Sequence, residues 1–106
     1  MNNGFVYLIA DLEKDYVYKI GVTKNIIEER KNELQTGNSS DLHICNFYET
    51  KYPYKIEAML HRKYESKKIK NEWFELTDEE AINFRKECKK CEDIIIALED
   101  NPFFSL

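Results

Sequence analysis

The sequence is poor in residues that interrupt regular structure, with three glycines and two prolines among 106 residues. It contains no internal repeat, low-complexity segment or linker, so it predicts one domain over residues 1–106, long enough to bury a core. A run of about 18 apolar residues is absent, and residues 1–4 lead straight into an apolar segment. We therefore expect an intracellular, cytoplasmic protein without a signal peptide or a membrane partner.

Cysteine is also scarce. Cys45, Cys88 and Cys91 are an odd number of thiols, which argues against a disulfide framework. Cys88 and Cys91 form a Cys-Lys-Lys-Cys motif, but the second ligand pair of a structural zinc site is missing. We expect buried, reduced thiols.

An overall excess of positive charge is absent, because the formal net charge is −4. Residues 1–76 hold 12 basic and 12 acidic side chains, whereas residues 77–106 hold 4 basic and 8 acidic ones. Within the neutral part, the stretch from Lys51 to Lys70 has a local charge of +5, from seven basic and two acidic residues. This stretch predicts either a phosphate-binding surface or an ordinary solvated helix face.

Two apolar segments organise the N-terminal part. Residues 5–9 and 16–22 are rich in β-branched and aromatic side chains and predict two strands, joined by a charged hairpin loop at residues 11–15. Strand alternation places Lys19 and Gly21 on the face opposite Ile20. The absent side chain at Gly21 predicts room for a substrate backbone to come close.

The remaining pattern alternates between helix and strand signals. It predicts a helix of about ten residues ending at Gly37, followed by a strand over residues 42–50. Pro53 opens a second helix that frays over residues 67–70, and a short strand follows at residues 71–76. A last helix over residues 77–100 begins with a Thr77–Glu80 capping box and is followed by Pro102. The order β-β-α-β-α-β-α predicts an α/β (α+β) fold, a small sheet with an N-terminal hairpin flanked by three helices.

Alternation along the strand expected at residues 42–50 predicts which side chains share a face of the sheet. Leu42, Ile44, Asn46 and Tyr48 are expected on one face, and Cys45 with its alternate neighbours on the other.

Five side chains offer chemistry suited to phosphodiester cleavage. They are Tyr7, Lys19, Arg30, Glu57 and His61. Glu57 could bind a divalent cation, and His61 lies one helical turn after it. Arg30 offers a planar fork of donors for phosphate oxygens. Taken singly, each also fits a structural role, such as a surface charge, an ion pair, a core tyrosine or a structural histidine.

Their joint order resembles the GIY-YIG nuclease superfamily, in its compact phage and mobile-element branch, over Gly4 to Leu76. The matching positions are Phe5-Val6-Tyr7, Lys19-Ile20-Gly21 with Val22-Thr23, Arg30, Leu34-Gln35-Thr36-Gly37-Asn38, Glu57 with Leu60 and His61, and Asn71-Glu72-Trp73-Phe74. Two positions depart from the motifs: Phe5 replaces a glycine, and Lys19 replaces a tyrosine. The histidine that many members carry just after the arginine is missing.

The resemblance implies a role for each residue. Glu57 would hold a single Mg²⁺ or Mn²⁺, Arg30 would contact phosphate, and Tyr7 would help to activate the attacking water. Lys19 is compatible with activity because lysine occurs at this position in some branches, where it could stabilise a tyrosinate at Tyr7 or bind phosphate. His61 could fill part of the role of the missing histidine.

The sequence therefore predicts a metal-dependent endonuclease acting on DNA, and the family precedent is a 5′-phosphate and a 3′-hydroxyl product. The alternative is a catalytically weak or inactive nucleic-acid-binding module of the same fold. Expected DNA contacts are Arg30, Lys55, Arg62, Lys63, Lys67 and Asn71. An apolar stripe on the last helix predicts either a monomer, with the stripe packed on its own sheet, or a weak homodimer.

Overall fold

The structure is a computed structural model that describes residues 3–100. Its strands are β1 (Gly4–Asp11), β2 (Val17–Thr23), β3 (Leu42–Thr50), β4 (Lys68–Lys70) and β5 (Trp73–Glu75). Its helices are α1 (Ile27–Thr36), α2 (Pro53–Lys63), the short 3-10 helix η1 (Glu65–Lys67), α3 (Asp78–Ile82) and α4 (Phe84–Glu99). Pro102, which follows the expected end of the last helix, lies outside the described residues.

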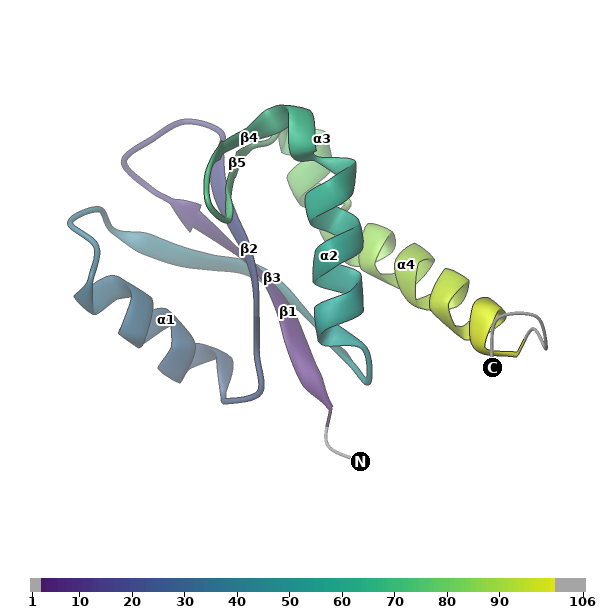
Figure 1. Cartoon of the computed structure of the whole chain (residues 1–106). Coiled ribbons are helices and arrows are strands. Elements are labelled where there is room, and N and C mark those ends of the chain that lie inside the picture. The colour runs from purple at the N-terminus through teal and green to yellow at the C-terminus, as the bar shows by residue number, and fades with distance from the viewer. Residues whose placement is uncertain (1–2, 101–106) are drawn as a thin grey trace.

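The strands form one antiparallel sheet in the order β3-β1-β2-β5-β4 (Figure 1). The predicted α+β class and the N-terminal hairpin are confirmed. In this hairpin Tyr7 lies opposite Gly21 and Ile9 lies opposite Lys19. The sheet therefore places the two predicted motif segments side by side.

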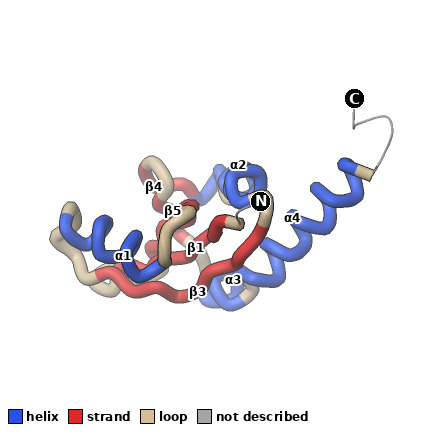
Figure 2. Tube along the Cα trace, turned by 90° about the horizontal axis from the view of Figure 1, so that it is seen from below, coloured by secondary structure: helices blue, strands red, loops and turns tan. Residues whose placement is uncertain are grey.

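Helices cover both faces of the sheet, with α1 and α4 at opposite ends of the molecule (Figure 2). Alternation along β1 sends Val6 and Leu8 into a large core with α2 and α4, and Tyr7 and Ile9 into a smaller core with Ile27 of α1. The central strand is thus buried on both sides, which fixes its register.

The predicted faces of β3 are wrong. Leu8 pairs with Asn46 and Ile9 pairs with Ile44, so Cys45 is an extra residue in a β-bulge. A bulge reverses the alternation. Ile44 consequently packs in the smaller core while Tyr48 packs against the larger one.

Two further expectations about the second half need correction. Residues after α2 do not fray but form η1 and then β4, which pairs with β5 through a tight turn that places Asn71 at φ 54°. The single last helix is divided at Asn83, whose φ of −85° and ψ of 9° depart from helical values. The capping box of Thr77 and Glu80 that opens α3 is confirmed.

The three cysteines are free. Cys88 and Cys91 are buried as expected, whereas Cys45, in the bulge of β3, is exposed. Within residues 3–100, none of the helices combines the length and the apolar character needed to cross a bilayer.

Candidate functional site

The candidate site lies along the outer edge of β2. This strand pairs with β5 only as far as Lys19. Immediately beyond, the Ile20 N–H donates to the Glu72 carbonyl at 3.1 Å, and the Ile20 carbonyl lies 2.9 Å from Nε2 of His61. The edge therefore brings α2 and the β4–β5 turn to β2, while α1 approaches from the other face of the sheet (Figure 1).

Gly21 makes room for Tyr7 within the protein itself. A Cβ built on Gly21 would lie 2.5 Å from Cζ and 2.9 Å from Cε1 of Tyr7, well inside van der Waals contact. The ring of Tyr7 thus lies directly over the backbone of Gly21. This contact explains why residue 21 is a glycine. The close approach of a substrate backbone, which the sequence suggested, is not needed to explain it.

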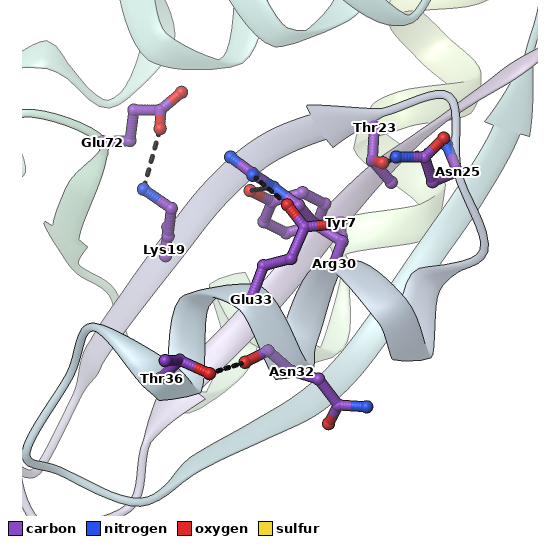
Figure 3. A network of polar contacts seen from close by, with 9 residues as sticks. All are labelled: Tyr7, Lys19, Thr23, Asn25, Arg30, Asn32, Glu33, Thr36 and Glu72. Carbon is purple, nitrogen blue, oxygen red and sulfur yellow. Dashed lines mark hydrogen bonds and ion pairs between the residues drawn. The ribbon is translucent and has the colours of Figure 1, made fainter.

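Tyr7 is fully buried, and its hydroxyl reaches Arg30 of α1. Nε of Arg30 donates to the Tyr7 hydroxyl at 3.5 Å, and Nη1 of Arg30 contacts Glu33 at 3.4 Å (Figure 3). Burial raises the pKa of Tyr7, and the Arg30 guanidinium only partly offsets this. Tyr7 is therefore a neutral phenol near pH 7 and serves as a hydrogen-bonding group that also orients Arg30.

Lys19 pairs with Glu72 rather than with Tyr7. The buried Lys19 ammonium donates to Oε2 of Glu72 at 2.7 Å (Figure 3). Burial would raise the pKa of Glu72, but hydrogen bonding and attraction to Lys19 hold it below its usual value. Lys19 thereby keeps a carboxylate charged at the edge of the site.

Glu57 carries the most unusual polar group of the site. Its Oε2 atom is buried and has no hydrogen-bond partner among the described residues. Burial and the neighbouring Glu72 carboxylate raise the pKa of Glu57 to about 7. A buried acceptor without a partner costs about 1–3 kcal/mol, so this atom would gain from a bound water or cation.

Glu57, His61 and Glu72 together fit a divalent cation. Each offers one ligand atom within 4.8 Å of the other two. Carboxylate oxygens are the ligands that Mg²⁺ and Mn²⁺ prefer, and imidazole is a ligand of first-row transition metals. The ring of His61 is held by Phe74, with ring centroids 4.9 Å apart, and by the Ile20 carbonyl. The two carboxylates therefore suit Mg²⁺ or Mn²⁺, and His61 adds a ligand that Mn²⁺ accepts more readily than Mg²⁺.

The predicted phosphate-binding lysines lie elsewhere. They contact carboxylates of the acidic C-terminal segment: Lys55 contacts Glu99 at 4.0 Å, Lys63 contacts Glu87 at 2.5 Å, and Lys67 contacts Glu80 at 2.9 Å. These three lysines are not gathered with Tyr7, Arg30 and Glu57. Arg62 and Asn71 are exposed.

The sequence prediction missed Glu72 as a site residue, although it quoted this glutamate inside a motif. Glu72 reaches the site because Asn71, at positive φ, turns the chain tightly between β4 and β5. The available signal was an asparagine followed by a glutamate between two short strand patterns.

Comparison with known proteins finds one family. The model of the T5orf172 domain matches residues 4–89, which include every residue of the site described above. No curated protein and no solved structure matches the chain.

Proposed function

The chain belongs to the T5orf172 domain family, a phage-associated family consistent with nuclease and DNA-binding functions, and on this premise we propose that it is a metal-dependent DNA endonuclease of the GIY-YIG type. It would hydrolyse phosphodiester bonds with one bound divalent cation, Mg²⁺ or Mn²⁺. Two groupings support the GIY-YIG assignment: Arg30 donates to the Tyr7 hydroxyl, and Glu57, His61 and Glu72 lie together beside β2.

The observation that carries the proposal is the buried, unpartnered Oε2 of Glu57 beside Glu72 and His61. Unpartnered buried acceptors are uncommon in native proteins, and a bound ion is one of the arrangements that satisfies them. A bound cation would polarise the scissile phosphate and offset the charge that develops on the leaving oxygen.

The other residues bind and orient. Arg30, held by the Tyr7 hydroxyl, presents its remaining N–H donors to phosphate oxygens. The Tyr7 hydroxyl is fully buried, so it would act by holding Arg30 in position for the phosphate. Lys19 keeps Glu72 ionised through their 2.7 Å contact, so that this carboxylate remains a ligand.

The test compares Glu57→Gln with Glu65→Gln, a change of similar size at an exposed glutamate of η1. Each protein is incubated with single-stranded, duplex and branched DNA, with Mg²⁺, with Mn²⁺ and with EDTA. We expect cleavage that needs the metal, leaves a 5′-phosphate and a 3′-hydroxyl, and falls at least about 1,000-fold in Glu57→Gln only. Equal cutting by both variants would contradict the assignment.

The alternative is a nucleic-acid-binding module without turnover. The pairing of Lys19 with Glu72 favours it, because a lysine in a carboxylate pair is less free to take part in proton transfer. In the same assay this module would retain DNA in a salt-sensitive manner and give no products with either metal.

A further inference from the structure

An apolar hollow lies beside the site, where α1 begins. It has a volume of about 390 Å³, within the roughly 300–1,000 Å³ typical of small-ligand pockets. Its apolar lining includes Phe5, Ile26, Ile44 and Phe47. Ile26 is 65% exposed and Phe47 is 43% exposed. The sheet and α1 thus leave an open apolar surface that no described side chain covers.

A cation and an aromatic ring lie at the rim of this hollow. Lys24 lines it, and Nζ of Lys24 is 5.8 Å from the ring centroid of Tyr54 in α2. The turn that carries Lys24 is fixed because the Asn25 N–H donates to Oγ1 of Thr23 at 3.0 Å (Figure 3).

The two rim residues, Lys24 and Tyr54, lie on segments that also carry residues of the candidate site. Tyr54 precedes Glu57 by three residues and His61 by seven, so all three share one face of α2. Along β2, Lys24 follows the segment that carries Lys19 and Gly21. Figure 3 shows Tyr7 and Arg30 between the Lys19–Glu72 pair and the Thr23–Asn25 turn. A chain of phosphates crossing the site would therefore pass Lys24 next.

We propose that the hollow is a subsite for one unpaired base of single-stranded DNA, next to the phosphate that the site cleaves. Lys24 would contact the phosphate of this nucleotide, and the exposed ring of Tyr54 would stack on a neighbouring base. This proposal rests on the proposed function and names its substrate as DNA that is single-stranded at the cleavage position.

The chemistry of the lining decides between base and phosphate. Glu28 also lines the hollow, so a phosphate inside it would face a carboxylate and apolar walls. A base is uncharged and presents a flat apolar face. A base held in a duplex is paired and stacked, and extracting it costs a few kcal/mol. The hollow therefore favours DNA whose base is already unpaired.

The test measures binding without cleavage. Binding is measured by fluorescence anisotropy in EDTA with a fluorescein-labelled oligodeoxythymidylate of roughly 12 nucleotides. It is compared with a series of the same strand in which one abasic sugar is moved through the internal positions, and with a duplex of equal length. The variants are Ile26→Gln and Lys24→Gln. Their controls are Ile82→Gln, at an isoleucine 77% exposed on α3, and Lys86→Gln, at an exposed lysine of α4.

For the unchanged protein and both controls, we expect the intact single strand to bind about tenfold more tightly than its best-placed abasic counterpart. Ile26→Gln should remove most of this difference, and Lys24→Gln should reduce the salt slope of binding by about one. Equal affinity of the unchanged protein for intact and abasic strands at every abasic position would overturn the subsite. Tighter binding of the duplex would overturn it as well.

The two proposals fail separately. Cleavage that depends on Glu57, together with no effect of Ile26→Gln on the abasic difference, would remove the base subsite and leave the nuclease. Loss of the abasic difference in Ile26→Gln, without metal-dependent products from any DNA, would remove the nuclease and leave a single-strand-binding site.

Discussion

The two sides of α2 carry charged residues with opposite fates. On the side that faces β2, Glu57 and His61 are half-buried, and Glu57 keeps an acceptor atom without a partner. On the side that faces α4, the exposed Lys55 and Lys63 are paired with Glu99 and Glu87. The β2 side therefore keeps an acceptor atom without a partner, whereas the two lysines on the α4 side are paired with carboxylates of the same chain.

The difference shows that a local charge sum is a weak guide to how much positive charge stays unpaired in the fold. The basic stretch from Lys51 to Lys70 attracted attention in the sequence, yet three of its lysines lie against acidic residues of α3 and α4. Exposed ion pairs of this kind contribute little to stability and compete with phosphate for the lysine. The side with few net charges is the one that holds the unpartnered Glu57 Oε2 atom.

After the loss of Glu57, the largest expected effect comes from disturbing the β2 side without changing any charge. In Gly21→Ala the new methyl group would displace the Tyr7 ring and, with it, Arg30. We expect kcat on DNA to fall about 100-fold, since small displacements of positioning groups have costs of this order. Steady-state cleavage assays measure it.

The matched control is Gly37→Ala, where the nearest atom to an added Cβ is the Leu34 carbonyl oxygen at 4.0 Å. Full activity of Gly37→Ala and loss in Gly21→Ala are expected. Wild-type kcat in Gly21→Ala would show that the close packing of Tyr7 on β2 is unnecessary.

A smaller effect should follow from removing the positive charge of Lys19 on the same side of α2. Lys19→Met leaves the Glu57 and Glu72 carboxylates close together without the ammonium that holds Glu72 charged. We expect activity to fall roughly 10–100-fold, as for other residues that support metal ligands, and rise partly with added Mn²⁺. Titration of Mn²⁺ against activity gives the apparent affinity; an unchanged affinity would rule out this role for Lys19.

Weaker still is the expected effect on the α4 side. The double variant Lys63→Gln, Lys67→Gln should change the affinity for single-stranded DNA less than about twofold, because both lysines are already paired. Lys24→Gln is the comparison on the other side. If the double variant weakens binding more than Lys24→Gln does, the α4 side is a DNA surface after all.

The smallest expected effect concerns acid stability. The Lys63 ammonium lowers the pKa of Glu87 below its usual value. Glu87 therefore stabilises the fold above the carboxyl pKa of the unfolded chain, and this contribution is lost as pH falls through the folded-state pKa.

In Glu87→Gln we expect the decline of unfolding free energy between about pH 5 and pH 3 to be shallower, by less than about 1 kcal/mol in total. Urea unfolding at each pH measures it, beside Glu79→Gln at an exposed glutamate of α3. A steeper decline would show that Lys63 does not favour ionised Glu87.

Most of the architecture followed from local patterns. The hairpin, α1, α2 and the capping box at Thr77 were predicted because their apolar periods and caps are encoded within a few neighbouring residues. The bulge at Cys45 was not, because it reconciles the packing of β3 with β1, which is distant in sequence. The three-residue strand β4 is wholly exposed and leaves no burial pattern to read.

The same contrast between local and long-range information holds for the site residues. Glu57 and His61 were paired correctly because their spacing is fixed by a single helix. The contact between Lys19 and Glu72 joins positions 53 residues apart, and the carboxylates that occupy Lys63 and Lys67 also come from other elements. Which charges meet across such separations is decided by the tertiary fold.

The central position of β1 has a consequence for folding during synthesis. Val6 and Leu8 emerge from the ribosome early, and they share one core cluster with Ile56 and Leu60 of α2 and with Cys88 and Ile95 of α4. Because domains are made from the N-terminus onward, α2 can cover the apolar face of the hairpin well before α4 completes this core.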